Sequence, residues 1–181
     1  MFFVFLDIAN NYPYSISAGN SKMEFMATGL ISLNHEVVVF NSRSGYENKY
    51  IEGNHNGLKF ILFPKGKLIQ YFKNAFRQCW ELLKIKKKKD NYVIIASTYS
   101  FLLVFDILYC KLVGYKVLFL FHELRSSLRS NKSAFKKIDA WLCDNFACYF
   151  VSGVLPISHY IERHIKKWFI PELRWQVYIV V

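Results

Sequence analysis

The sequence is poor in cysteine, and its few thiols are not placed for metal binding. It has four cysteines in 181 residues, Cys79, Cys110, Cys143 and Cys148. None forms a Cys-X-X-Cys pair, and no set of cysteine, histidine or carboxylate side chains has the spacing of a metal site. We therefore predict buried, reduced thiols without a disulfide framework, and we expect no metal.

Acidic residues are also scarce, because 24 lysines and arginines stand against 13 aspartates and glutamates, for a net charge of +11. The excess is concentrated between Lys65 and Lys89, where Glu81 is the single acidic residue. Such a patch fits an anionic membrane, and a solvated helix end is the equal alternative. Nucleic acid is less favoured, because no recognised binding module accompanies the lysines. The residues predicted to face the membrane are Lys84, Lys86, Lys87, Lys88 and Lys89.

Apolar runs long enough to cross a membrane are also lacking, and so is the pattern of a secretory signal. Residues 101–121 are apolar but include Asp106, Lys111 and Lys116, which favours a buried helix and strand over a membrane span. Residues 1–6 are too short for a secretory signal and lack a basic start. We expect a cytoplasmic chain, either free or peripheral on the inner face of the cell membrane. The absence of a strict Gly-X-Gly-X-X-Gly fingerprint disfavours a nicotinamide dehydrogenase.

What the sequence does contain is an alternation of strand-like and helix-like segments. We predict strands at residues 2–6, 37–40, 58–63, 92–96, 116–121, 151–157 and 176–181. We predict helices at residues 21–33, 68–89, 98–113, 134–149 and 160–168, and a polar loop at 41–57. This alternation is typical of an α/β, Rossmann-like fold with an open, mostly parallel sheet and helices on both faces. The length predicts one domain over residues 1–181.

Two of these helices carry a marked apolar face. In the basic helix at 68–89 the face consists of Leu68, Phe72, Ala75, Phe76, Cys79 and Leu83. In the helix at 134–149 it consists of Ile138, Leu142 and Phe146, which are four residues apart. Lysine stems can lie along the margin of such a face while their charges stay in water.

The first 40 residues have the pattern of a βαβ unit with a phosphate-binding turn. An apolar strand leads into a mostly polar loop, Asp7 to Ala18, which ends at Gly19 in front of a helix capped by Asn20 or Ser21. Phosphates bind at helix N-termini of this kind, where a glycine lets the backbone approach them. Gly19 is therefore predicted to bind phosphate, with an ordinary loop glycine as the alternative. Asn20 either adds a hydrogen-bond donor or serves only as the cap.

Three segments, in this order, resemble the N-terminal domain of subfamily-4-like glycosyltransferases, which have the GT-B fold. They are the Gly19 turn and helix leading to His35-Glu36-Val37, the segment LFLFHELRSSL at 118–128, and the segment VSGVLPISHYIERHI at 151–165. The sequence departs from the family pattern at Asn34 and at Asn20, where family members typically have glycine. The ordered set covers most of the chain.

This resemblance implies a retaining transferase that moves a sugar from a nucleotide-diphosphate sugar to a lipid-linked or polysaccharide acceptor, with no cofactor or metal. In the family, the histidine at the place of His122 lies beside the reacting sugar, so we expect a catalytic role for it. Gly19 and Asn20 would meet the donor diphosphate. The residues predicted to bind acceptor at neighbouring strand ends are Glu123, Arg125, Asp7 and Ser97. Glu123 and Arg125 also fit ordinary loop charges, and Asp7 also fits a turn cap.

The family's second domain, which carries most of the donor site, has no counterpart in these 181 residues. We therefore expect a fragment, a truncated product or one subunit of a split enzyme, completed by a separate C-terminal-domain chain and inactive alone. Two alternatives stay open. One is a non-catalytic subunit that binds acceptor or recruits the enzyme to a membrane, and the other is an unrelated nucleotide-binding, Rossmann-like protein.

Overall fold

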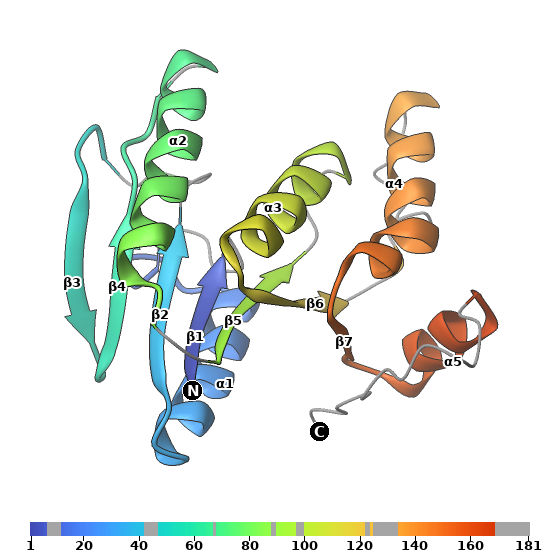
Figure 1. The fold of residues 1–181 in the computed structure, drawn as a ribbon, viewed down its shortest axis with the longest axis horizontal. Coiled ribbons are helices and arrows are strands. Elements are labelled where there is room, and N and C mark those ends of the chain that lie inside the picture. Colours follow the sequence, from blue (N-terminus) through green and yellow to red (C-terminus); the bar gives the residue numbers. More distant parts are fainter. Residues whose placement is uncertain are drawn as a thin grey trace. The chain divides into compact units, whose positions relative to one another are not determined.

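The structure is a computed structural model that describes residues 1–6, 12–41, 47–66, 68–87, 90–96, 100–121, 124 and 134–168. The chain divides into two compact units, Met1–Ile94 and Ile95–Val181. Strands and helices alternate along it (Figure 1). The α/β class predicted from the sequence is confirmed, because the described residues contain seven mostly parallel strands between helices. A single domain over the whole chain stays a prediction.

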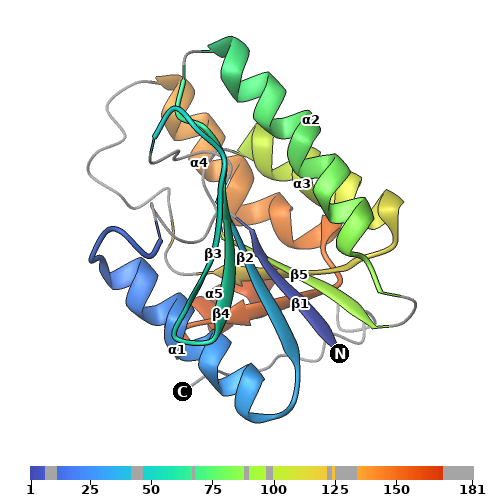
Figure 2. The same ribbon diagram turned by 90° about the vertical axis from the view of Figure 1, so that its left-hand side faces the viewer.

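The first unit is built on a mostly parallel sheet. Its strands are β1 (Phe2–Leu6), β2 (Glu36–Asn41), β3 (Ile51–His55), β4 (Leu58–Leu62) and the first part of β5 (Asn91–Ala96). Their order is β3-β4-β2-β1-β5. β2 runs parallel to β1 and to β4, with Val4 opposite Val38, whereas β3 is antiparallel to β4. Figure 2 shows α1 (Ala18–Ser32) and α2 (Leu68–Ile85) on opposite faces of this sheet.

The parallel strands of the first unit are mostly apolar and mostly buried. All five residues of β1 are buried, and in β2 Glu36 alone is exposed. A parallel sheet covered by helices on both faces requires such continuous apolar runs. The strands predicted at 2–6, 37–40 and 58–63 are therefore confirmed to within one residue at each end.

The second unit is built around two parallel strands, β6 (Lys116–Phe121) and β7 (Gly153–Pro156), with Leu118 opposite Gly153. Its helices are α3 (Ser100–Val113), α4 (Ala134–Phe146), the 3-10 helix η2 (Ala147–Phe150) and α5 (His159–Trp168). α3 packs against β6, α4 and η2, and α5 packs against β7. The predicted end of α3 at residue 113 is confirmed: the next residue, Gly114, has a φ of 94°, and Tyr115 N–H donates to the Cys110 carbonyl at 2.9 Å.

The loop predicted at 41–57 is wrong in part, because Asn41 belongs to β2 and residues 51–55 form β3. β3 lacks an alternating apolar pattern and is mostly exposed, so periodicity does not reveal it. The turn from β3 to β4 is Asn56-Gly57, with φ angles of 52° and 81°. An Asn-Gly pair with both residues at positive φ is a strong hairpin signal, and it was available in the sequence. The strand predicted at 176–181 lies outside the described residues.

Two predicted helix ends are also wrong. α2 ends at Ile85 rather than at residue 89. Beyond it, Lys87 N–H donates to Asn91 Oδ1 and Asn91 Nδ2 donates to the Lys87 carbonyl, both at 2.8 Å, which turns the chain into β5. α4 ends at Phe146, and residues 147–150 continue as the tighter η2 instead of as the predicted α-helix.

The apolar faces that the sequence marks on α2 and α4 are partly exposed. In α2, Phe76 and Leu83 are exposed, whereas Asn74, Gln78 and Leu82 are buried. Asn74 can face inward because its Nδ2 donates to the Pro64 carbonyl at 2.8 Å. In α4 the buried residues include two aspartates and one asparagine, and the exposed ones include Ile138, Leu142 and Phe146.

The thiols lie mostly in the interior. Cys110, Cys143 and Cys148 are buried, Cys79 is half-buried, and none of the four belongs to a disulfide. Burial is the main cause that raises the pKa of the Cys148 thiol to about 12, so this thiol stays protonated and unreactive at neutral pH. No helix of the described residues is both long enough and apolar enough to cross a membrane.

Candidate functional site

The structure describes only some of the residues predicted to form the site. Gly19 and Asn20 lie together in the first turn of α1, in the first unit. Lys84 is in the last turn of α2, and Lys86 and Lys87 follow that helix. The predicted residues that lie outside the described part of the chain are Asp7, Ser97, His122, Glu123, Arg125, Lys88 and Lys89. Their roles stay predictions.

The N-terminus of α1 is capped by Ser17, not by Asn20 or Ser21. Ser17 has extended backbone angles, and its Oγ accepts from Asn20 N–H at 3.1 Å. An extended serine just before the first helical residue is a favoured cap, because its hydroxyl satisfies an amide that the helix leaves unpaired. The helix therefore begins at Ala18, earlier than predicted, and Gly19 belongs to its first turn rather than to the loop.

The side chain of Asn20 holds the loop that leads into α1. Its Nδ2 donates to the Ser15 carbonyl at 2.7 Å and lies 3.1 Å from Ser15 Oγ. The residue is only 4% exposed, so the amide is buried with its partners. In this arrangement Asn20 positions the backbone in front of the helix N-terminus. Binding of a ligand by its side chain stays a prediction.

A second group of contacts joins this loop to α1 and to the β3–β4 hairpin. The Tyr12 ring packs edge-on against His55 and Phe60, with ring centroids 5.7 and 6.2 Å apart. Asn56 Nδ2 donates to Glu24 Oε1 at 2.8 Å. Burial, followed by the nearby Glu24 carboxylate, raises the pKa of Tyr12 to about 12, so the phenol stays neutral. This group of contacts was not predicted, although the Asn-Gly turn in the sequence indicates the hairpin that takes part in it.

In the second unit, two strand ends meet at one edge. Phe121 ends β6 opposite Pro156 in β7, and Ile157 N–H donates to the Phe121 carbonyl at 3.3 Å. The carboxyl ends of parallel strands are where open α/β sheets place ligands. His122 is the next residue after Phe121 in the sequence, although it lies outside the described residues. The His164 ring lies edge-on to Phe121, with centroids 6.5 Å apart.

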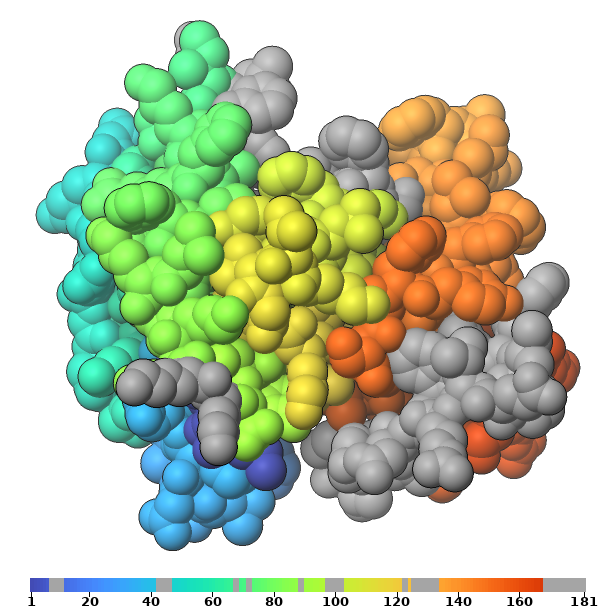
Figure 3. All heavy atoms as spheres, viewed as in Figure 1, coloured from blue at the N-terminus to red at the C-terminus, as the bar shows by residue number. Residues whose placement is uncertain are grey.

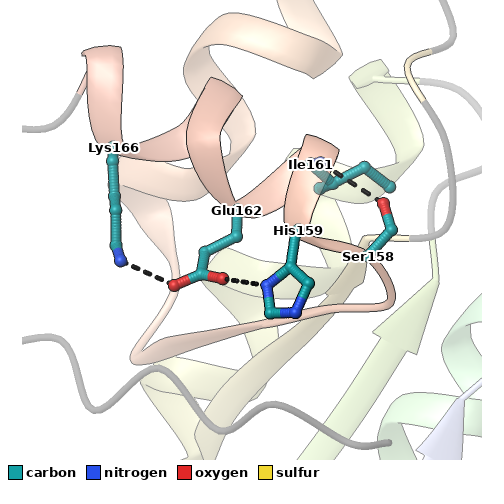
Figure 4. A network of polar contacts seen from close by, with 5 residues as sticks. All are labelled: Ser158, His159, Ile161, Glu162 and Lys166. Carbon is teal, nitrogen blue, oxygen red and sulfur yellow. Dashed lines mark hydrogen bonds and ion pairs between the residues drawn. The ribbon is translucent and has the colours of Figure 1, made fainter.

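At the same edge, α5 begins with a capped and charged first turn (Figure 4). Ser158 Oγ accepts from Ile161 N–H at 3.3 Å and so caps the helix. Glu162 lies 2.6 Å from Lys166 Nζ and 3.1 Å from His159 Nδ1. The hydrogen bond from Lys166, then that with His159, lowers the pKa of Glu162 below its usual value. This network was not predicted, although Glu162 is three residues from His159 and four from Lys166, spacings at which helical side chains meet.

The cations at the end of α2 are accessible. Lys84 Nζ lies 3.1 Å from Glu81, and Lys87 Nζ lies 3.1 Å from Glu36, yet both lysine side chains are more than half exposed. Exposed ion pairs of this kind are weak, so they do not prevent these lysines from meeting another anion. Within the described ranges, no group of three histidine, cysteine or carboxylate side chains could hold a metal ion.

Mostly parallel strands that alternate with helices place the chain in the class of α/β, Rossmann-like folds. The model of the family described as Glycosyltransferase Family 4 matches residues 23–178, which is most of the chain. The protein therefore belongs to Glycosyltransferase Family 4, and its function is of the glycosyltransferase type. The match includes Ser97, His122, Glu123 and Arg125 but begins after Asn20. The comparison with curated proteins gave no match.

Proposed function

We propose that this chain is the acceptor-side, N-terminal domain of a retaining glycosyltransferase. The domain would act in sugar transfer from a nucleotide-diphosphate sugar to a lipid-linked or polysaccharide acceptor, on the cytoplasmic face of a membrane. The observation that carries the proposal is the match to Glycosyltransferase Family 4 over residues 23–178. The parallel strands and capped helices of both units support it, because such elements present amides and side chains to anionic ligands.

In this proposal the site residues have separate roles. His122 acts beside the reacting sugar, where the bond from the anomeric carbon to the leaving diphosphate breaks, a bond to the acceptor hydroxyl oxygen forms, and the hydroxyl proton passes to the released diphosphate. Gly19, with the first turn of α1, binds the donor diphosphate, while Asn20 positions the preceding loop. The residues assigned to the acceptor are Glu123, Arg125, Asp7 and Ser97. Leaving-group charge would be met by backbone amides and basic side chains, without a metal or another cofactor.

We further propose that activity requires a second domain, either on the same polypeptide or on a separate chain. The test is sugar transfer by the completed enzyme, with a panel of radiolabelled nucleotide-diphosphate sugars and both classes of acceptor. The His122→Ala variant should lower kcat by about 10²–10³-fold, the usual loss when a hydrogen-bond donor that stabilises developing charge is removed. The matched control is His35→Ala, because the His35 ring packs on Phe3, 5.5 Å between centroids, and has no proposed role in transfer.

Full transfer activity in His122→Ala would refute the catalytic role, and absence of transfer from every donor would refute the function. A second candidate is a non-catalytic subunit that binds acceptor or recruits an enzyme to a membrane. The exposed lysines at the end of α2 favour this candidate specifically. It predicts vesicle binding without turnover, and it predicts that His122→Ala has no effect in a reconstituted complex.

A further inference from the structure

The helix α2 presents a row of large apolar side chains to the solvent. The exposed fractions are 72% for Ile69, 77% for Phe76, 60% for Trp80 and 49% for Leu83. At about 100° per residue, these four positions fall within about 60° of one another around the helix axis. They span about 21 Å along the axis, at about 1.5 Å per residue. We call this row the α2 apolar stripe.

The orientation of α2 is set by its inner face, which consists of buried residues outside the stripe. Asn74 and Gln78 are each 4% exposed, and Leu82 is fully buried. Gln70 Nε2 donates to Asn74 Oδ1, and Asn74 Nδ2 donates to the Pro64 carbonyl, both at 2.8 Å. The inner face lies on the opposite side of the helix from the α2 apolar stripe. The first unit therefore holds α2 with the α2 apolar stripe outward, and Figure 3 shows the helix (green) at the surface.

Cations flank the α2 apolar stripe on one side. Lys73, Arg77 and Lys84 lie along this side of the helix and are exposed. The Arg77 guanidinium is stacked 3.7 Å from the centre of the Tyr50 ring, which fixes its stem, and Lys84 Nζ lies 5.8 Å from the Trp80 ring. The single acidic residue of the helix, Glu81, is only 13% exposed and pairs with Lys84. The exposed face is therefore apolar and cationic.

We infer that α2 lies flat on an anionic lipid bilayer, with the α2 apolar stripe at the boundary between headgroups and acyl chains. A helix with aromatic and aliphatic residues on one face and cations beside them has the chemistry of an interfacial helix. The lysines would meet lipid phosphates, and Trp80 would lie at headgroup depth. The inference deepens the proposed function, because a lipid-linked acceptor would then be reached from the surface on which the domain rests.

The test uses vesicles of phosphatidylglycerol and phosphatidylcholine in equal amounts, compared with phosphatidylcholine alone. A protein that keeps Trp80 as its single tryptophan should show blue-shifted emission on anionic vesicles and quenching by lipids brominated on the acyl chains. The Ile69→Ser/Phe76→Ser double variant should bind roughly 30-fold more weakly, because two large apolar side chains no longer leave water. The Lys84→Gln variant should bind about fivefold more weakly, and salt should weaken all binding.

The matched control is the Phe135→Ser/Ile138→Ser double variant on α4, where the two side chains are 75% and 60% exposed. It removes a similar exposed apolar area and should keep vesicle binding unchanged. Circular dichroism checks that all variants fold. Equal loss of binding in both double variants, or bound protein whose Trp80 is not quenched, would overturn the inference.

Two further outcomes separate this inference from the proposed function. Vesicle binding through α2 without sugar transfer would leave the inference standing and remove the function. Transfer to a water-soluble acceptor without any vesicle binding would refute the inference and leave the proposed function standing. If the protein instead forms dimers that the Ile69→Ser/Phe76→Ser variant dissociates, the stripe is an interface between two copies and the inference is wrong.

Discussion

Leu82 and Leu83 are neighbours in α2 with opposite surroundings, which makes them a matched pair for testing how the helix is oriented. Leu82 is fully buried, whereas Leu83 is 49% exposed. We expect Leu82→Ala to lower the free energy of unfolding by about 2–5 kcal/mol, because the lost methyl groups leave a cavity. Both variants make the same chemical change in the same helix, so the difference in helix propensity cancels.

The expected cost of Leu83→Ala follows from its exposure. Full burial of a leucine side chain contributes about 1.5–3 kcal/mol, and a side chain that is half in water can lose only about half of that. No closed cavity forms at a surface position, so the cost should stay near or below about 1 kcal/mol. The two variants should therefore differ by roughly 2 kcal/mol or more in the free energy of unfolding.

Urea unfolding followed by far-UV circular dichroism measures this difference directly. The two variants should have the same dependence on urea, so that a shift of the midpoint reports stability alone. In thermal unfolding, each kcal/mol should move Tm by about 2–4 °C for a chain of this size. If Leu83→Ala costs as much as Leu82→Ala, α2 is rotated, its apolar face lies inward, and the α2 apolar stripe does not exist.

Three smaller predictions test the local contacts described above. Asn20→Ala should lower the free energy of unfolding by about 1–3 kcal/mol, because buried partners in the loop lose their donor; a neutral result in urea unfolding would contradict the loop contact. Gly57→Ala should lower the free energy of unfolding by about 1–2 kcal/mol in the same assay. The positive φ is the whole cause, because an added Cβ would have no atom within 4 Å. The pKa of Glu162 is lowered in the folded chain, so its contribution is present above the ordinary glutamate pKa and lost as the pH falls through the lowered one. Lys166→Gln should raise that pKa toward its ordinary value in an NMR titration, and an unmoved pKa would mean that Lys166 is not its cause.

The strands buried on both faces could be predicted because nearly all of their residues are apolar. Every residue of β1 is apolar, and the only charged or polar residue of β6 is Lys116, at its exposed first position. A segment that is buried on both faces needs no partner to be recognised, since its own composition excludes a solvent-facing side. β3 was missed for the converse reason: it lies mostly in water, so its strand character comes from its pairing with β4.

The helix faces could not be predicted, because apolar spacing shows that a helix has two faces but not which one is inside. In α2 the inner positions Asn74 and Gln78 are polar, and the partner of Asn74 is the Pro64 carbonyl, ten residues earlier. In α4 the inner positions include Asp139 and Asp144. A buried amide or carboxylate is tolerated only when a partner is in place, and that partner is fixed by tertiary structure.

The position of Gly19 at the start of α1 was predicted to within one helix turn, but the contacts around it cannot be inferred from residue spacing. A glycine between a strand and a helix indicated the N-terminus of α1, and Gly19 does lie in the first turn of that helix. The sequence offered several residues that could cap the helix, since serine and asparagine are both good caps. The loop backbone selects Ser17 as the cap, and the buried contact of Asn20 with Ser15 fixes that loop.

The capping geometry limits which backbone amides at the N-terminus of α1 can bind an anion. Ser17 already accepts from the N–H of Asn20 through its hydroxyl and from that of Ser21 through its carbonyl, at 3.1 and 3.0 Å. An anion at this terminus would therefore be met by the amides of Ala18 and Gly19. Gly19→Ala keeps the amide and should raise stability by up to about 1 kcal/mol, because alanine favours the helix.

If the backbone must also approach the diphosphate closely, the added methyl group of Gly19→Ala should weaken nucleoside diphosphate binding by the completed enzyme about tenfold or more, equivalent to about 1.4 kcal/mol. The control is Gly29→Ala in the same helix, where an added Cβ would have no atom within 4 Å. It should give a similar gain in stability with unchanged affinity in a calorimetric titration. If the two variants bind the diphosphate equally well, close approach at Gly19 is refuted and only its amide can take part, because stability has been matched between them.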